Sequence, residues 1–344
     1  MKSLFFITLF ALLFAFGCGS EDKKADPLSG DSISTSETIF TNPVQINEGV
    51  NLLYDLNKGT TLKYKMRNYN KSIQSIVADS TMSQSMVQEI EYFFTVKIKD
   101  KEESGNLTID FVCDQIKAKG ESSLGEKLNY DSKNPPADSL ERKKYMNFDV
   151  IVGADFSARI SSTGEIIDIF KTDKILDKII SGAPQQPTST EKAQLRNEIQ
   201  QAVLKPLIQQ IFKNTTDKKM NIDSSWTLTY PSQISVFEMD NSAQYKLKNF
   251  YEKDDSRIAE IDAALTVKSK GKTEFSEGGV NYNFEKPKTS GSGKLYFDLD
   301  RNCIKRAESN VSFELTLKMK ETKTGKEAKR IDKVETRNVT ELLN

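Results

Sequence analysis

The sequence predicts an α+β fold: a large, curved antiparallel sheet, half-barrel-like, with a few helices packed on its concave face. Long segments alternate apolar and polar residues, which is typical of antiparallel strands with one solvated face. Met86–Lys99 and Val311–Lys320 show this alternation most clearly. Fourteen residues at about 3.3 Å each span roughly 45 Å, and strands of that length favour a strongly curved sheet over a compact sandwich.

The N-terminus predicts a secretory signal peptide over residues 1–17. The segment MKSLFFITLFALLFAFG begins with a methionine and one lysine, continues with an apolar run and ends in the small residue Gly17. This order of segments is that of a signal peptide. The apolar run is shorter than the roughly 20 residues that a transmembrane helix needs. We therefore expect cleavage in front of Cys18.

Cys18 and the residues before it resemble the lipobox of bacterial lipoproteins. In that family the cysteine thiol carries diacylglycerol and the signal is removed, so the resemblance implies that Cys18 is the site of lipid attachment. Ala15 stands where Leu is usual in the family, and Phe16 follows it. Several acyl chains give durable anchoring, because each buried methylene contributes roughly 0.8 kcal/mol.

Residues 18–45 are predicted to form a flexible, lipidated tether. They are rich in Ser, Asp and Lys and contain almost no large apolar residue before Ile39, a composition that disfavours a packed core. Ser20, Glu21 and Asp22 resemble the acidic export signal that some Bacteroidota lipoproteins carry for surface display. We expect the protein to be lipid-anchored in the cell envelope, at the outer membrane, facing either the periplasm or the cell surface.

Residues 46–344 are predicted to form a single antiparallel α+β domain. An alternative division has two sheet halves, residues 46–135 and 222–344, joined by a helical middle. The turn Ser161–Ile166 joins two short strands, with Gly164 supplying a positive φ. The other expected strands include Thr60–Met66, Met86–Lys99, a strand from Leu107, Ser224–Tyr230, Ala259–Val267, Val311–Lys320 and a last strand near Ile331–Thr340.

Helical spacing marks three segments in the middle of the chain. Thr188 and Glu191 form the capping-box pattern at the start of the longest one, which continues to Asn214. Pro206 lies inside this segment and should kink or divide it, since proline lacks the backbone N–H that a helix needs. Asp173–Ile180 and Ser139–Ile151 are shorter candidates.

The composition argues against several classes of function. Lys+Arg and Asp+Glu both number 49, so no net charge attracts nucleic acid. Histidine is absent, which excludes histidine-based acid–base catalysis, Ser–His and Cys–His nucleophiles, and the commonest transition-metal ligand. The carboxylates are scattered along the chain. We therefore expect no catalytic residues, no metal site and no cofactor, and we predict that the protein is not an enzyme.

One acidic segment begins like a calcium-binding loop. Asp298, Asp300 and Asn302 have the right spacing, but the EF-hand pattern then requires Gly at the sixth position and Glu at the twelfth. Cys303 and Ser309 occupy those positions, and the flanking segments alternate like strands. A hairpin turn with Asn302 in the left-handed φ region explains these residues better.

Cys113 and Cys303 are the two thiols other than Cys18, and both lie in expected strands. Export permits a disulfide between them, which would stabilise the fold by about 5 kcal/mol in the loop-entropy picture. Two buried free thiols are the alternative, because cysteine also behaves as a small apolar residue.

The pattern of the body resembles the half-barrel of the LolA/LolB and LppX lipoprotein-carrier folds. It also resembles a group of Bacteroidota envelope lipoproteins with a GxxxxYxM segment, which stands here at Gly59–Met66. The function expected from these features is that of a non-enzymatic binding or structural module of the envelope. The alternative is a carrier of an apolar, acyl-chain ligand held between sheet and helices. The expected partners are the membrane, through the N-terminal lipid, and either an apolar ligand or an envelope protein.

We expect the Cys18→Ser substitution to abolish acylation and the accompanying signal removal, because the hydroxyl does not replace the thiol in thioether formation. Metabolic labelling with a tagged fatty acid, followed by immunoprecipitation, measures this directly. Fatty-acid label retained on the serine variant would contradict the assignment of Cys18.

Overall fold

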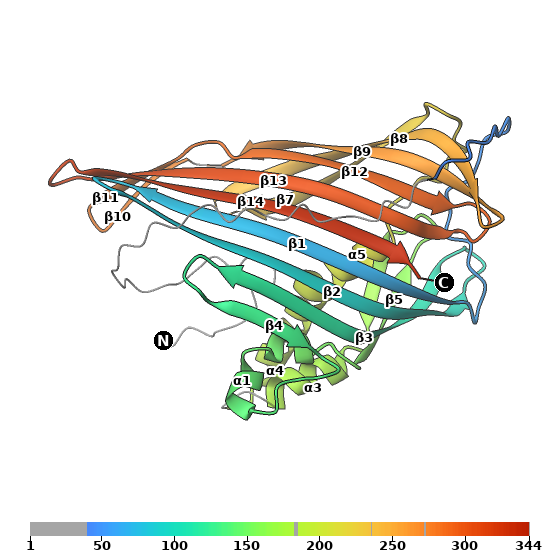
Figure 1. The fold of residues 1–344 in the computed structure, drawn as a ribbon, viewed down its shortest axis with the longest axis horizontal. Helices are drawn as coiled ribbons and strands as arrows, with labels where there is room; N and C mark the ends of the chain where they lie inside the picture. Colours follow the sequence, from blue (N-terminus) through green and yellow to red (C-terminus); the bar gives the residue numbers. More distant parts are fainter. Residues whose placement is uncertain (1–39, 182–184, 235, 272, 344) are drawn as a thin grey trace.

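One open antiparallel sheet dominates the computed structural model (Figure 1), which describes residues 40–181, 185–234, 236–271 and 273–343. Its strands are β1 (Thr61–Val77), β2 (Thr81–Lys101), β3 (Leu107–Ser122), β4 (Lys127–Asp131), β5 (Asp155–Ile160), β6 (Ile166–Phe170), β7 (Ser225–Ile234), β8 (Phe237–Lys253), β9 (Ser256–Lys270), β10 (Glu274–Glu277), β11 (Val280–Phe284), β12 (Lys288–Asp298), β13 (Cys303–Glu321) and β14 (Glu327–Leu342).

The strand order confirms the predicted fold class. The main path is β6-β5-β3-β2-β1-β14-β13-β12-β9-β8-β7, with β4 paired to β3 and the β10–β11 hairpin paired to β13. The β1–β14 pair joins the early strands to the late ones, so the described strands from both ends of the chain lie in one sheet. β6 and β7 are the two ends of the path, and the sheet is open.

The alternating segments lie within long strands, as expected. Met86–Lys99 is part of β2 and Val311–Lys320 is part of β13. On β13, Leu315 is buried and Phe313 is half-buried on the same face. Both strands extend beyond the predicted segments, and the added residues of β13 include Cys303, Ile304 and Ala307, which are buried in the main hydrophobic cluster.

The helices follow the predicted segments with two breaks. Ser139–Ile151 forms two short helices, α1 (Ser139–Lys143) and α2 (Met146–Asp149), and α3 spans Asp173–Ser181. The long segment forms α4 (Ser189–Glu198), the π-helical turn η1 (Ile199–Leu204) and α5 (Lys205–Ile211).

The start and the interruption of this long segment both have local causes. The capping box is present, with the Thr188 and Glu191 side chains each bonded to the other's backbone N–H. Pro206 lies in the first turn of α5, directly after η1. The wider π-helical turn accommodates a residue that has no N–H and whose ring crowds the preceding turn.

The helices pack on the concave face of the sheet but cover only part of it. Figure 1 shows α3, α4 and α5 gathered near one half, while β10 and β11 lie at the far end. The Phe212 ring, at the end of α5, lies 6.0 Å from Phe111 on β3 and 5.1 Å from Tyr54. These contacts belong to the main hydrophobic cluster, which unites helices and sheet.

A second, smaller cluster lies towards the far end. Its buried members in the described chain are all strand residues: Phe237, Met239, Phe284 and Leu315. Phe313 packs against this cluster and stays half-buried. The two ends of the sheet therefore differ in how completely their apolar side chains are covered.

We expect Phe297→Ala to lower the free energy of unfolding by about 3–5 kcal/mol, because this ring is 0% exposed in the main cluster. Phe313→Ala should cost less, about 1–2 kcal/mol, since its ring is already partly hydrated. Urea unfolding of both variants measures the difference. Equal losses would mean that the far end of the sheet is packed as tightly as the helix-covered end.

Candidate functional site

The concave-facing side chains line up in rows that cross the sheet, and three successive rows matter here. The covered row is Leu247, Ile261, Leu295, Ala307, Thr340, Met66 and Tyr92. The boundary row is Trp226, Tyr245, Ala263, Gly293, Ser309, Asn338, Asn68 and Ile90. The open row is Leu228, Ala243, Leu265, Gly291, Val311, Thr336, Asn70 and Gln88.

Burial falls steeply from the covered row to the open row. Every member of the covered row is at most 6% exposed. In the open row every member except Ala243 keeps partial solvent exposure. Leu228, Leu265 and Val311 belong to neither hydrophobic cluster of the described chain. From β7 to β13 the open row is thus an apolar stretch of sheet between two packed regions.

The open row is also divided along its length. From β7 to β13 it carries aliphatic side chains and Gly291, whereas from β14 to β2 it carries Thr336, Asn70 and Gln88. Asn70 donates a hydrogen bond to the Thr336 hydroxyl at 3.1 Å. One half can hold apolar atoms, and the other half can hold polar ones.

Two glycines of β12 leave the concave face without side chains at this strand. A methyl group on Gly293 would lie 2.6 Å from the carbonyl oxygen of Glu308, and one on Gly291 would lie 2.9 Å from the Leu265 Cβ. Neither position accepts a side chain without a shift of its neighbours. β12 therefore contributes backbone, and no bulk, to the concave face in both the boundary and the open rows.

The boundary row carries polar atoms without partners. The Trp226 indole stacks on Tyr245 with ring centroids 5.0 Å apart, and burial raises the pKa of Tyr245 to about 12. The Trp226 Nε1 and the Asn68 Oδ1 are buried and have no hydrogen-bond partner. Since buried polar groups in native proteins are nearly always paired, this row is suited to receive a polar group.

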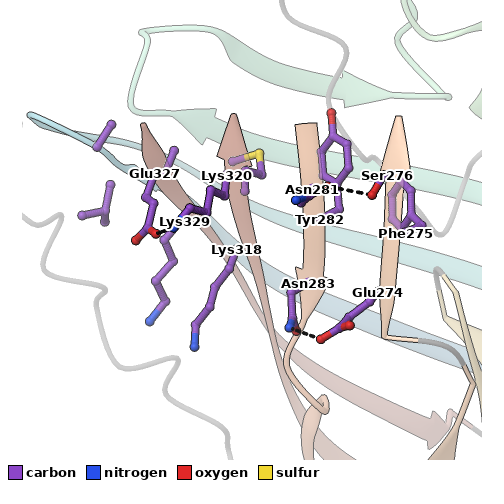
Figure 2. Close-up of a pocket in the computed structure, with 14 residues that line it drawn as sticks. Glu274, Phe275, Ser276, Asn281, Tyr282, Asn283, Lys318, Lys320, Glu327 and Lys329 are labelled. Atoms are coloured by element: carbon purple, nitrogen blue, oxygen red, sulfur yellow. Dashed lines mark hydrogen bonds and ion pairs between the residues drawn. The ribbon is translucent and has the colours of Figure 1, made fainter. Parts of the chain in front are cut away.

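Two surface hollows are weaker candidates, and Figure 2 shows the first, at the far end of the sheet. It has a volume of about 850 Å³ between the β10–β11 hairpin and the ends of β13 and β14. Phe275 and Tyr282 stack there at 4.7 Å. Lys320 pairs with Glu327 at 2.8 Å, and Asn283 donates to Glu274 at 2.7 Å. These polar groups already bind one another.

The second hollow lies on the convex face and has a volume of about 930 Å³. At its rim Phe40 stacks on Tyr296 at 4.6 Å. Glu260 is 5% exposed. Burial alone acts to raise the pKa of Glu260, but hydrogen bonds from Lys294, Asn249 and Tyr251 hold it below the usual value. Its charge is balanced within the fold.

The acidic segment after β12 is a turn, as the sequence predicts. The Asp298 carboxylate accepts hydrogen bonds from the backbone N–H groups of Asp300 and Arg301 at 3.1 and 2.8 Å. Asp300 pairs with Arg257, and Asn302 has a φ of 53°. Within the described ranges no group of three or more His, Cys, Asp or Glu residues could hold a metal ion.

Cys113 and Cys303 are free and buried, which corrects the disulfide alternative. Cys113 lies on β3 and Cys303 begins β13, with β2, β1 and β14 between them in the sheet. Neighbouring strands are about 4.8 Å apart, whereas a disulfide requires Cα atoms within roughly 7 Å. Burial raises the pKa of both thiols to about 12.

Cys18 and most of the expected tether lie outside the described residues. The same holds for the expected signal peptide, residues 1–17. Within the described chain no helix is both long enough and apolar enough to cross a membrane.

The fold defines the class: an open antiparallel sheet with helices on part of one face. The chain belongs to DUF6263, a family of unknown function, whose sequence pattern matches residues 104–303. A comparison with curated proteins gives no match.

Solved structures give distant similarities. A lipovitellin structure concerned with lipid–protein interactions is 10% identical, with a TM-score of 0.45, and the match covers 84% of this chain and 25% of that one. An outer membrane channel from Pseudomonas putida F1 is 8% identical over 83% of this chain and 97% of its own, with a TM-score of 0.18. A DUF1329 protein from Desulfovibrio piger is 9% identical over 78% and 83%, with a TM-score of 0.13.

We expect neither Cys113 nor Cys303 to react with iodoacetamide at pH 8 in the folded protein, because the thiolate is the nucleophile and burial suppresses its formation. In denaturant without any reductant, both should react. Intact mass spectrometry of the delipidated protein counts the added groups. Two unreactive thiols in denaturant, released only by a reductant, would establish a disulfide instead.

Proposed function

We propose that this chain is a non-enzymatic, lipid-anchored protein of the bacterial cell envelope that binds an acyl chain on the concave face of its sheet. The observation that carries the proposal is the open row, with Leu228, Leu265 and Val311 left between two packed clusters. Exposed apolar area of this kind marks a binding surface.

The shape of the open row favours an elongated apolar ligand. Its apolar half crosses five neighbouring strands, from β7 to β13, which is about 19 Å at 4.8 Å per spacing. Gly291 in this row and Gly293 in the boundary row add no side chains to the concave face along this path. A chain of methylenes laid across it would bury apolar surface on both partners, at roughly 25 cal/mol per Å².

The anchoring and the location rest on the N-terminal pattern. The lipobox-like Cys18 after a signal-length apolar run supports lipid attachment, and the Ser- and Asp-rich residues behind it support a tether. The non-enzymatic role is supported by the absence of histidine from the chain. It is also supported by the described carboxylates at the two hollows, which serve in hydrogen bonds and ion pairs.

We expect palmitate, added to purified protein that has been stripped of lipid, to raise the melting temperature, because a ligand that binds only the folded state stabilises it by mass action. At a free concentration of one hundred times Kd the gain is about 2.7 kcal/mol. Val311→Lys should remove this shift, since it places an ammonium in the apolar half of the open row.

Asn310→Lys is the matched control for Val311→Lys. Asn310 is the preceding residue of β13, exposed on the opposite face of the sheet, so this variant should respond to palmitate like the unmodified protein. A melting temperature that palmitate and phospholipid both leave unchanged in the unmodified protein would overturn the proposal. That result would favour a structural or interaction module of the envelope.

A further inference from the structure

The polar half of the open row continues directly from its apolar half. Val311 on β13 is paired with Thr336 on β14, and Thr336 is paired with Asn70 on β1. These three strands run side by side in the middle of the sheet (Figure 1). Neighbouring strands are about 4.8 Å apart, so a ligand that covers Val311 reaches Asn70 within about 10 Å.

Hydrogen bonds join the polar side chains of the boundary and open rows on these strands. Asn68 donates to the Asn338 Oδ1 at 2.9 Å, and Asn338 donates to the Ser309 hydroxyl at 3.5 Å. In the open row, Asn70 donates to the Thr336 hydroxyl at 3.1 Å. We call these five residues the polar patch. All five keep partial solvent exposure, so a ligand can reach the patch.

The concave face at the polar patch carries no charge. None of the residues in the boundary and open rows is Asp, Glu, Lys or Arg, although these types make up 28% of the chain. The neighbouring Arg67 and Arg337 point to the convex face and pair with acidic residues there. Further out on β14, Asp332 pairs with Arg330 at 3.0 Å. A charged head on the polar patch would therefore lose water without gaining a counter-charge.

The polar patch has hydrogen-bonding capacity to spare. The Asn68 Oδ1 is buried and has no partner within the described chain. The Thr336 hydroxyl accepts a bond from Asn70, and its own proton remains available to a ligand. A ligand must therefore offer donors as well as acceptors. Hydroxyl groups do both, whereas an ionised carboxylate only accepts.

We propose that the polar patch is the head-group site of the acyl-chain ligand, and that this ligand is an uncharged amphiphile with a hydroxylated head, a glycerol or a sugar. The inference rests on the proposed function, because the tail of the same molecule lies over the apolar half of the open row. The pairing of Val311 with Thr336 marks the point where the tail meets the head.

Four probes with the same lauroyl tail test the nature of the head. 1-Lauroylglycerol and sucrose monolaurate carry hydroxyl groups, laurate carries a charge, and methyl laurate carries neither a charge nor a donor. Calorimetric titration of the full chain stripped of lipid, below the micelle concentration of each probe, gives the dissociation constants. We expect at least one hydroxylated probe to bind about tenfold or more tightly than laurate and methyl laurate, as two or three hydrogen bonds imply.

Two substitutions test the place of the head. Thr336→Val removes one hydroxyl and keeps a β-branched side chain, so it should weaken the preferred hydroxylated probe about fivefold. Asn68→Leu should weaken it about tenfold. Both variants should bind methyl laurate like the unmodified protein. Thr266→Val is the matched control, because Thr266 is exposed on the convex face of β9, and it should change no affinity.

The outcomes separate the two proposals. Equal binding of all four probes, or tightest binding of laurate, would overturn the uncharged head and leave the apolar site in place. A preference for hydroxylated probes that survives both Thr336→Val and Asn68→Leu would overturn the assignment to the polar patch. No binding of any probe would overturn both proposals. The ratio between 1-lauroylglycerol and sucrose monolaurate tells a glycerol head from a sugar head.

Discussion

The register of the sheet is the constraint on which the rest of the structure depends. Successive residues of a strand point to opposite faces, so a slip of one residue would turn the whole apolar set of that strand outwards. In the helix-covered half, packing against α5 and its neighbours fixes the register. Beyond the covered row, hydrogen bonds between polar side chains do so, as in Asn68 to Asn338 at 2.9 Å and Gln74 to Asp332 at 3.0 Å.

This division explains why the sheet can extend so far beyond its helices. Amide and hydroxyl side chains hold the strands side by side without forming a closed core, and they leave the aliphatic residues opposite them accessible. The far half has fewer buried apolar contacts than the near half, so it should open locally at lower free energy than the helix-covered half. Such a region adapts more easily to ligands of different length.

Much of the fold can be predicted from the sequence because its signals are local. The alternation of Val311–Lys320 identified both the strand and its facing, and Thr188 with Glu191 identified the start of a helix. The left-handed turn at Asn302 followed from its residue types. The separation of Cys113 from Cys303 could not be predicted, since it depends on how many strands lie between them in the sheet.

The candidate site was harder to predict for a related reason. The apolar face of Ala259–Val267 was evident from alternation, and it includes Leu265. Whether a helix covers Leu265 depends on where η1 and α5 end in space.

The free edge of the sheet at β7 has a consequence for self-association. An exposed strand edge presents unpaired backbone groups that can add a strand from another molecule, which is the first step of sheet-templated aggregation. Pro231 lies in the middle of β7 and is paired with Asp240 of β8. Proline is tolerated at an edge because its missing N–H can face away from the neighbouring strand. A foreign strand docking there would find a hydrogen-bond donor missing from the ladder, so the exposed edge at β7 is a poor template for self-association.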